Sequence, residues 1–497
     1  MMVWIFANLE TPVDPESVNL FLLASYLVSI VLSLRVIMRR LSVGTTLGWI
    51  SVLFLIPFIG AVIYLLLGDI QLGARRSRRV SALNTPYREW LRNAAKALST
   101  DVGDRSEGAR VLHRQAYRAT GMPAVGGNEV RILNQWDEVL EQWIADIDSA
   151  EETVFMEFYI WSAGGLADEV LEACKRALAR GVVCRILVDS VGSDRFLKSS
   201  ACSRARHAGV EIGEALPAGW IKGLFQRQDI RLHRKIVLID GRIGYTGSLN
   251  MADAGLFKQT SGVGQWVDMM VQVQGPGVLL LTSVFLKDWI SETEEDPKGF
   301  ASAYLNLEGG AKGPGRVRLQ PVPSGPGFYS QAIYQTLLTG IFASRNRMVL
   351  TTPYFVPDEP ISTALAAAAR RGVDVTLIVP ERVDSRIVEY ASRSHFETLM
   401  EAGVRIALFH GGLLHSKTIT IDDDMAFVGS VNLDQRSFWI NFEITLLVFD
   451  TEFCRDLGAL QRNYFEESTI LDLETWRQRP MAQQLVENTL RLASPLL

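Results

Sequence analysis

The stretch "HRKIVLIDGRIGYTGSLN" (233–250) reads as two short apolar strands around an Asp-Gly turn, with polar residues at fixed places. It opens on a histidine with a lysine two residues later, and it closes on Gly-Ser-x-Asn. A second stretch, "HSKTITIDDDMAFVGSVN" (415–432), keeps these polar residues at the same spacing on different apolar residues. One bare copy would be ordinary, whereas two matching copies indicate a duplicated functional element.

The duplication extends well beyond the motif. "ARGVVCRILV" (179–188) corresponds to "RRGVDVTLIV" (370–379), and "HAGVEI" (207–212) corresponds to "EAGVRI" (401–406). In both passes, short β-branched runs alternate with Ala- and Glu-rich helical segments, which is typical of an α/β sheet. We therefore expect two tandem α/β domains related by pseudo-two-fold symmetry.

Composition divides the chain into four segments. Residues 1–70 form a hydrophobic helical hairpin, 71–127 a basic connector that is helical in part, 128–307 the first α/β domain and 308–497 the second. The boundary between the two domains is the Gly/Pro-rich stretch at 308–327.

Apolar residues gather at the front of the chain, where 18–34 and 45–68 contain no charge. The second run is long enough to cross a bilayer core of about 30 Å, and the first is near the lower limit. Hydrophobic residues make up 48% of the chain, which is high for a soluble enzyme. We therefore expect a membrane-bound protein.

Arginines flank both apolar runs. Arg35, Arg39 and Arg40 lie in the connection, and the positive-inside rule would place them in the cytoplasm together with a larger cluster. That cluster follows the second run and comprises Arg75, Arg76, Arg78, Arg79, Arg88 and Arg92. Two full crossings cannot satisfy both groups. Either the connection is outside, or one run dips in and returns, which Pro57 and Gly60 would ease. The larger cluster favours a cytoplasmic body and suits anionic headgroups.

The spacing within the motif predicts a hairpin. His233 and Lys235 are two apart and so project from one face of a strand. With Asp240-Gly241 as a two-residue turn, His233 lies opposite Ser248 and Lys235 opposite Thr246. The second copy turns at Asp422-Asp423 and places its residues in the same way, with His415 opposite Ser430 and Lys417 opposite Val428. Gly247 and Gly429 would leave room for a ligand near the backbone.

The residues collected by the two hairpins suit a phosphodiester. Lysine supplies charge to the non-bridging oxygens, and Ser and Asn supply directional donors. Histidine serves as nucleophile or proton donor, and displacing an alcohol from phosphorus without a metal needs one of each. Pseudo-two-fold packing would bring His233 and His415 face to face. The phosphate-binding candidates are Lys235, Ser248, Asn250, Lys417, Ser430 and Asn432.

Each imidazole also needs a carboxylate to fix its tautomer. Glu443, in "SFWINFE", is the candidate partner for His415 in the second half. In the first half the corresponding residue is Asp268 of "QWVDMMVQV", which we expect beside His233.

The totals exclude other classes of function. A net charge of −5 disfavours a nucleic-acid-coating protein, which needs a strongly basic face. The four cysteines, Cys174, Cys184, Cys202 and Cys454, have no zinc-finger spacing. Neither a metal site nor a disulfide framework is indicated, and no cofactor is expected.

The doubled H-x-K-x₄-D-x₆-G-S-x-N pattern resembles the phospholipase D superfamily. The N-terminal "LGWISVLFLIPFIGAVIYLLLGDIQLGARRSRR", "HRKIVLIDG" and "DQRSFWINFE" are similar to bacterial cardiolipin synthases over essentially the whole chain. The resemblance implies a location in the bacterial cell membrane, no metal and a covalent phosphatidyl-histidine intermediate. Phosphatidylglycerol would be donor and acceptor, giving cardiolipin and glycerol.

The resemblance also implies residue roles. His233 and His415 would be nucleophile and general acid/base, and either could take either role. Asp240 and Asp422 would complete the catalytic motif in a structural capacity. The sequence departs from the family's Arg-x-Asn-x-Arg before the first histidine, where it has Gln228 and Asp229.

Other activities stay open on the sequence. A hydrolase would let water replace the acceptor and release phosphatidic acid, because acceptor choice depends on pocket shape and water exclusion. Phosphatidylethanolamine could serve as donor or acceptor. A nuclease is disfavoured by the acidic balance, and a non-catalytic lipid-binding scaffold by the intact polar residues of both copies.

Overall fold

The computed structural model describes residues 15–39, 43–68, 73–103, 105–217, 227, 229–257, 262–300, 304–307, 313–327 and 329–492. The chain divides into two compact units. The N-terminal unit comprises Met1–Ala74 with Ala218–Asp229, and the body comprises Arg75–Pro217 with Ile230–Leu497.

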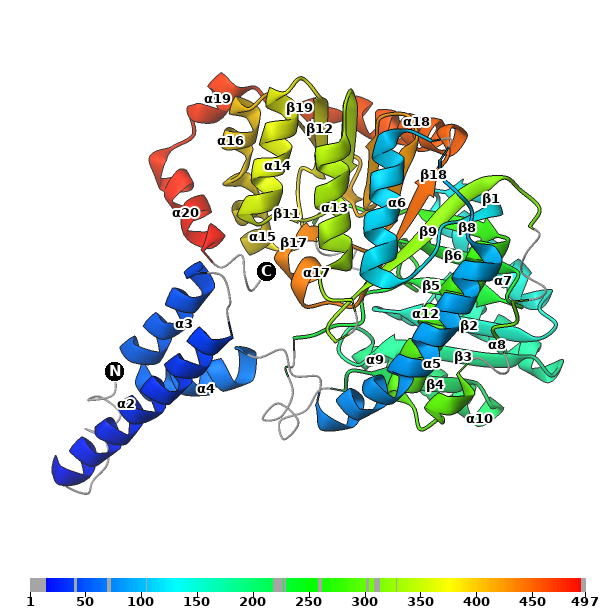
Figure 1. Cartoon of the computed structure of the whole chain (residues 1–497), viewed down its shortest axis with the longest axis horizontal. Helices are drawn as coiled ribbons and strands as arrows, with labels where there is room; N and C mark the ends of the chain where they lie inside the picture. Colours follow the sequence, from blue (N-terminus) through cyan, green and yellow to red (C-terminus); the bar gives the residue numbers. More distant parts are fainter. Residues whose placement is uncertain are drawn as a thin grey trace. The chain divides into compact units, whose positions relative to one another are not determined.

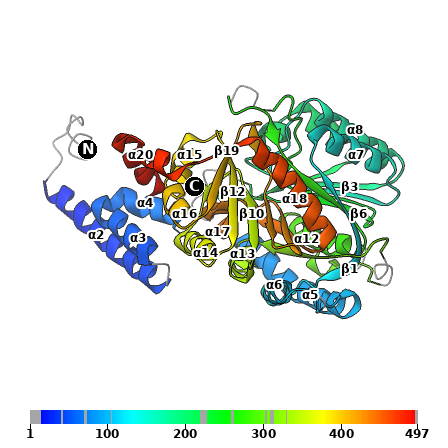
Figure 2. The same ribbon diagram turned by 90° about the horizontal axis from the view of Figure 1, so that it is seen from above.

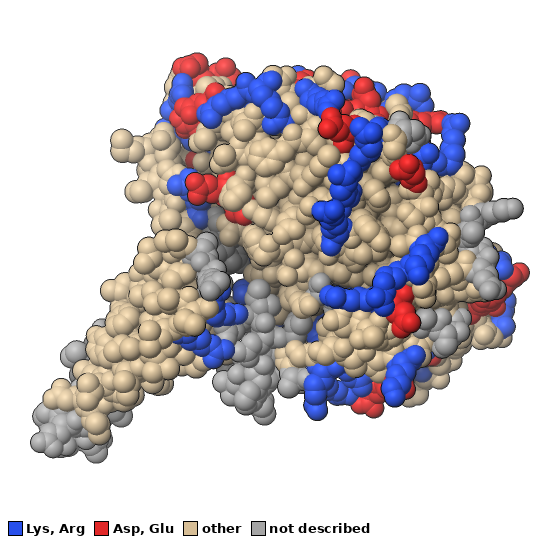
Figure 3. All heavy atoms as spheres, in the orientation of Figure 1, with Lys and Arg blue, Asp and Glu red and all other residues tan. Residues whose placement is uncertain are grey.

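The N-terminal unit contains the two apolar runs. Its described helices are α2 (Pro15–Met38), α3 (Val43–Leu55) and α4 (Pro57–Leu67). They enclose a small apolar core of Leu32, Val36, Leu53, Ala61 and Tyr64. On the face shown in Figure 3, the described surface of these helices is mostly uncharged.

One described helix segment, Asn19–Met38 of α2, is long and apolar enough to cross a membrane, with a mean hydropathy of 2.3. The second run, which the sequence predicts to be long enough for a crossing, is instead divided at Ile56 into α3 and α4. The cause is Pro57 at the start of α4, since proline cannot continue the hydrogen bonding of the preceding helix.

The residues expected as a basic connector form two helices of the body, α5 (Ala74–Leu98) and α6 (Glu107–Thr120). Arg76 is buried and forms an ion pair with Glu292. It is therefore not available to lipid headgroups, and the prediction that the whole arginine cluster faces them is wrong at this residue. Arg75 stays exposed at the surface.

The body is built on one sheet. In the described residues it has 15 strands in the order β19-β13-β12-β10-β15-β16-β18-β9-β1-β8-β6-β5-β2-β3-β4. The strands of its first half are β1 (Val125–Leu133), β2 (Thr153–Phe158), β3 (Val183–Asp189), β4 (Glu211–Ala215), β5 (Ile236–Ile239), β6 (Ile243–Gly247) and β8 (Met270–Gln274). Those of its second half are β9 (Val317–Ser324), β10 (Arg347–Thr351), β12 (Asp374–Pro380), β13 (Arg405–Phe409), β15 (Thr418–Ile421), β16 (Met425–Gly429), β18 (Glu443–Phe449) and β19 (Ser468–Ile470).

The strand order shows the duplication directly. Outward from the centre, β1-β8-β6-β5-β2-β3-β4 corresponds to β9-β18-β16-β15-β10-β12-β13. The central strands β1 and β9 are antiparallel, as a two-fold axis between them requires. The two α/β domains expected from the sequence therefore share a continuous sheet across their pseudo-two-fold axis.

Helices cover both faces of this sheet (Figures 1 and 2). In the first half they are α7 (Trp136–Asp148), α8 (Leu166–Ala179), α9 (Asp194–Leu197), α10 (Ser200–Ala208) and α12 (Pro276–Glu292), with a 3-10 turn at Pro297–Gly299. In the second half they are α13 (Ala332–Ala343), α14 (Glu359–Arg370), α15 (Arg386–Arg393), α16 (Phe396–Glu401), α17 (Gln435–Trp439), α18 (Thr451–Glu466), α19 (Leu473–Arg477) and α20 (Met481–Arg491).

Alternation along the strands separates the two layers of the core. Val154 and Met156 of β2 belong to the apolar cluster built with α7 and α8. Phe155, between them, points the other way and stacks on Phe285 of α12, with ring centroids 5.0 Å apart. Near the axis α12 is buried on all sides, consistent with its apolar composition.

Candidate active site

The two motifs form equivalent hairpins, β5–β6 and β15–β16. Ile236 pairs with Thr246, and Thr418 pairs with Val428. The expected two-residue turn is wrong by one residue, because Ile239 pairs with Ile243 around a three-residue loop. Asp-Gly suits both loop lengths, and Asp240 adopts a left-handed φ of 52° that this loop needs. Continuing the register places Lys235 opposite Gly247.

The motif glycines serve the sheet and not a ligand. A Cβ on Gly247 would lie 2.3 Å from the backbone oxygen of Met269, and one on Gly429 would lie 2.2 Å from that of Ile444. The neighbouring strand therefore fills the space that the sequence suggested was left for a ligand.

The motif aspartates lie away from the histidines. The Asp240 carboxylate accepts backbone N–H bonds from Glu151, Glu152 and Thr153 at 2.7–2.9 Å. Asp422 accepts equivalent bonds from residues 345–347. Both lie at the far end of a strand from the histidine, about 20 Å along an extended chain. The structure does not bring Asp240 and Asp422 into the site.

Near the axis the two halves exchange strand ends. The backbone N–H of His233 donates to Phe442 of the second half at 2.9 Å. The backbone N–H of His415 donates to Val267 of the first half at 2.8 Å. Short parallel pairings continue this exchange, with β7 (Trp266–Val267) against β14 (Leu413–Leu414). A second small sheet, β11 (Phe355–Val356) with β17 (Leu433–Asp434), lies within the second half.

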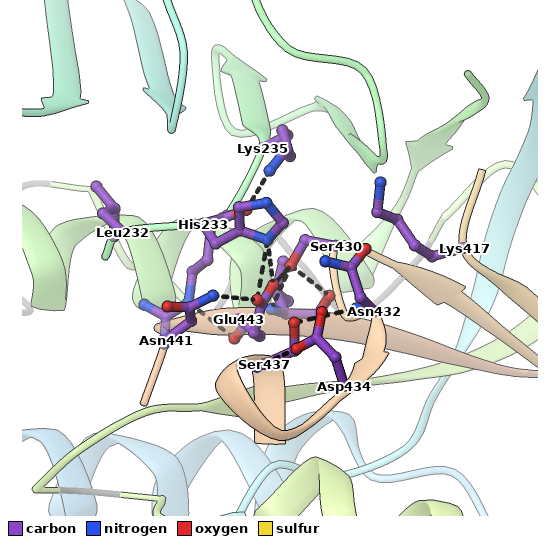
Figure 4. Close-up of polar contacts among 12 residues, drawn as sticks. Leu232, His233, Lys235, Lys417, Ser430, Asn432, Asp434, Ser437, Asn441 and Glu443 are labelled. Carbon is purple, nitrogen blue, oxygen red and sulfur yellow. Dashed lines mark hydrogen bonds and ion pairs between the residues drawn. The ribbon is translucent and has the colours of Figure 1, made fainter. Parts of the chain in front are cut away.

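Each histidine consequently meets the carboxylate of the other half. His233 Nδ1 lies 2.9 Å from Glu443, and His415 Nδ1 lies 2.6 Å from Asp268 (Figure 4 shows the first pair). The expected pairing within each half is therefore wrong, because the exchanged strands place Glu443 and Asp268 across the axis. Both predicted carboxylates nevertheless contact an imidazole.

The motif serines hold these carboxylates. Ser248 Oγ donates to Asp268 Oδ1 at 2.6 Å, and Ser430 Oγ donates to Glu443. An ionised carboxylate only accepts, so each histidine donates through Nδ1 and keeps Nε2 for chemistry. The serines thus contact the carboxylates that hold the imidazoles.

Burial controls the charges in the site. It lowers the pKa of His233 and of His415 to about 4 against the opposing effect of each carboxylate, so both are neutral at pH 7. Burial opposes ionisation of Glu443 and Asp268, but the adjacent histidine and lysine outweigh it and lower both pKa values. Burial also lowers the pKa of Lys235 to about 8.

The motif lysines are positioned by the backbone. Lys235 Nζ donates to the carbonyl of His233 at 2.6 Å, and Lys417 Nζ donates to that of His415 at 2.6 Å. Burial lowers the pKa of Lys417 well below its ordinary value. Both ammonium groups are thereby held beside the imidazoles.

Both histidines line one cavity of about 400 Å³. Asn250 and Asn432 line it as well, and Asn250 Oδ1 accepts the N–H of Ile160 at 3.2 Å. Within the described part of the chain, the buried Oδ1 of Asn432 has no hydrogen-bond partner. Among the described residues, no group of three or more His, Cys, Asp or Glu is arranged to hold a metal ion.

Several cavity residues were not identified from the sequence: Tyr159, Arg231, Trp266, Tyr354, Asp384 and Arg436. Tyr159 and Trp266 flank the histidines, with the Trp266 ring centroid 4.4 Å from that of His415. Proximity to the motif could have indicated Arg231 and Trp266, whereas Tyr354 and Asp384 come from distant loops. Of the departures before His233, Gln228 lies outside the described residues and Asp229 pairs with Arg227.

The fold is a duplicated α/β fold, and each motif histidine pairs with a carboxylate of the other half. These features define the phospholipase D class. Within that class, the chain belongs to the cardiolipin synthase family with phospholipase D-like domains, whose model matches residues 143–289 and 337–466. A model described as phospholipase D-nuclease N-terminal matches 27–68. The predicted fold class and family are confirmed.

Curated relatives extend the match to nearly the whole chain. Cardiolipin synthase A of Yersinia pseudotuberculosis serotype O:1b (strain IP 31758) and that of Yersinia pestis are each 40% identical over 94% of this chain and 95% of their own. A crystal structure of phosphatidylserine synthase from Haemophilus influenzae Rd KW20 shares the fold. Its TM-score is 0.58 at 15% identity, covering 79% of this chain and all of that one.

Proposed function

We propose that this enzyme transfers a phosphatidyl group from one phosphatidylglycerol to another, giving cardiolipin and glycerol. The observation that carries the proposal is the pair of carboxylate-held imidazoles in one cavity, each with Nε2 left for reaction. The relatives named cardiolipin synthase A support this choice of substrate.

In the first step, Nε2 of one histidine attacks the donor phosphorus. The P–O bond to glycerol breaks, the other histidine gives its proton to the glycerol oxygen, and a phosphatidyl-histidine remains. Glu443 and Asp268 stabilise the imidazolium that forms at their respective partners. Because His233 and His415 have equivalent partners, either is equipped to attack.

In the second step, the primary hydroxyl of the acceptor attacks phosphorus. Its proton passes to the second histidine, the P–N bond breaks, and cardiolipin is released. Both histidines are neutral before a phosphodiester binds, which suits the nucleophile. The negative charge of a bound phosphodiester raises the pKa of the histidine that must act as an acid.

The remaining motif residues have separate roles in this proposal. Lys235 and Lys417 neutralise the non-bridging oxygens, and Asn250 and Asn432 offer amide donors to them. Ser248 and Ser430 hold the carboxylates through the hydrogen bonds described above. Asp240 and Asp422 brace the hairpin turns and take no part in the chemistry.

For membrane topology we propose that α2 spans the bilayer while α3 and α4 dip in and return, with the body on the cytoplasmic side. The break at Ile56 supports a returning segment, and this arrangement satisfies the positive-inside rule for Arg35, Arg39 and the arginines of α5. Met38→Cys and Arg78→Cys, made singly, test this topology. A membrane-impermeant thiol reagent should label each cysteine in opened cells and not in intact cells.

The function is tested with the full chain in detergent, given labelled phosphatidylglycerol without divalent metal. Cardiolipin with an equal amount of glycerol is the expected result. Phosphatidic acid as the only product would show that the protein is a hydrolase. Turnover only after phosphatidylethanolamine is added would show that this lipid, and not a second phosphatidylglycerol, is the other substrate. His207→Ala, at an exposed histidine of α10, is the matched control for variants of the cavity histidines.

A further inference from the structure

The proposed reaction brings two anionic lipids into one cavity, and the inference made here rests on that proposed function. The motif lysines serve the phosphorus that is attacked. The acceptor phosphatidylglycerol has a phosphodiester of its own, separated from its attacking hydroxyl by one glycerol. Taking an unpaired anion out of water costs several kcal/mol. The acceptor therefore requires a second cationic group near the first.

Two arginines occupy the cavity wall. Arg231 and Arg436 line the same cavity as His233 and His415. Tyr159 lines this cavity with them, and both guanidinium groups counteract the rise that burial causes in the pKa of Tyr159. The Tyr159 ring centroid is 5.2 Å from that of His233. Both cations thus share the cavity wall with the two reacting imidazoles.

The backbone and side-chain contacts fix where these arginines lie. Arg231 is 6% exposed, and its Nη1 lies 3.2 Å from Asp189 Oδ1. Asp189 also accepts the N–H of Leu232 at 2.9 Å, which ties this carboxylate to the strand before His233. The Arg436 carbonyl accepts the N–H of Asn441, another cavity residue, at 2.9 Å. Guanidinium groups are well suited to phosphate.

Two carboxylates share the cavity with them. Asp384 accepts the hydroxyl of Tyr354 at 2.6 Å, and Asp434 accepts the N–H of Ser437 at 2.7 Å. Carboxylate oxygens accept hydroxyl hydrogens and repel phosphate oxygens. They favour the glycerol hydroxyls of a ligand and leave its phosphate to the arginines.

The arginines also break the symmetry of the duplicated site. At the position equivalent to Arg231, the second motif has Leu413, and at that equivalent to Arg436, the first has Ala254. Histidine, lysine, serine and asparagine occur in both halves, whereas each arginine occurs in one. A symmetric set is sufficient for a single phosphate, and the unmatched pair gives the cavity a distinct second side.

We propose that Arg231 and Arg436 form a second phosphate subsite that binds the phosphodiester of the acceptor lipid. From there its terminal hydroxyl reaches the phosphatidyl-histidine, the P–O bond forms, the P–N bond breaks and the proton passes to the other histidine. An acceptor without phosphate, such as ethanol or water, makes no use of this subsite.

Competition between acceptors tests the subsite. The full-length enzyme in detergent is given labelled phosphatidylglycerol as the only lipid, with ethanol added. Cardiolipin and phosphatidylethanol then arise from the same intermediate, so their ratio is independent of donor binding. Arg436→Gln removes a charge-assisted contact, and we expect the ratio of cardiolipin to phosphatidylethanol to fall about 10- to 100-fold. Arg436→Lys retains the charge and should give an intermediate ratio.

Arg382→Gln is the matched control, because Arg382 is exposed on the same half and does not line the cavity. Its product ratio should equal that of the wild type. An unchanged ratio in Arg436→Gln, with both products reduced together or neither reduced, would overturn the subsite. Wild-type enzyme that makes no cardiolipin would overturn the proposed function and the subsite with it.

Discussion

The strands that carry His233 and His415 place the same motif residues in the site, but the layers behind them differ in kind. Behind His233 the layer is charged. Arg234 forms a buried ion pair with Asp288 of α12, and its Nε donates to the Glu443 carbonyl at 3.0 Å. Glu157 is fully buried among three cations, and burial raises its pKa to about 7. Those cations are Arg76, Arg234 and Lys287.

Behind His415 the layer is neutral. Ser416 stands where the first motif has Arg234, and the network beyond it consists of hydroxyl and amide groups. Thr418 Oγ1 lies 2.7 Å from Thr351 Oγ1 and accepts from Gln461 Nε2 at 3.0 Å. The cavity face is constrained by one reaction, whereas the opposite face needs only to pair its polar groups. Apart from the two unmatched arginines, the two halves have therefore stayed alike where they would meet substrate and diverged behind the motif residues.

The largest effect should come from the shared face. His233→Ala and His415→Ala should each lower kcat about 10⁴-fold or more, because one removes the nucleophile and the other the proton donor. A donor with p-nitrophenol as leaving group needs no proton, so only the variant that retains the nucleophile should still form a phosphatidyl-protein. Labelled lipid bound to the protein after denaturation measures this. Near-normal kcat in either variant would contradict the two-histidine mechanism.

The next effect distinguishes the two back layers. Arg234→Ser, which copies the second motif, leaves Asp288 buried without its ion-pair partner and should cost about 3–5 kcal/mol of unfolding free energy. Ser416→Ala should cost about 1 kcal/mol or less. Guanidinium unfolding in detergent, followed by tryptophan fluorescence, compares the two. Equal losses of unfolding free energy in the two variants would mean that the buried ion pair behind His233 contributes no more to stability than the neutral layer behind His415.

Each carboxylate contacts the histidine of the other half, and this pairing can be tested through the pKa values of the two histidines. Glu443→Gln should lower the pKa of His233 further, because the carboxylate now raises it, and should leave His415 less affected. Asp268→Asn should do the reverse. We expect kcat to fall about 10- to 100-fold in each. NMR of isotopically labelled histidine side chains measures the pKa values, and a shift in the same-half histidine instead would exclude the crossed pairing.

The sequence predicted the repeat, the α/β class and the residues of the motif because these depend on spacing and composition. It did not predict the crossed pairs, because Glu443 meets His233 only through the exchange of strand ends between halves. No period in the sequence encodes that exchange. Asp-Gly fits loops of two or three residues, so the register was open, whereas Pro57 did indicate the break in the second apolar run. Asp384 reaches the cavity through tertiary folding alone.

The smallest effect concerns the motif aspartates, which the two halves use alike. Asp240→Asn and Asp422→Asn keep the side-chain size and tolerate the left-handed φ, but they lose the charge that strengthens three backbone hydrogen bonds. Each should cost about 1–2 kcal/mol of unfolding free energy while kcat stays within about twofold. Denaturant unfolding and cardiolipin formation, measured on the same preparations, separate stability from chemistry. A large loss of kcat at unchanged stability would return these aspartates to the catalytic machinery, although they lie at the far end of their strands from the histidines.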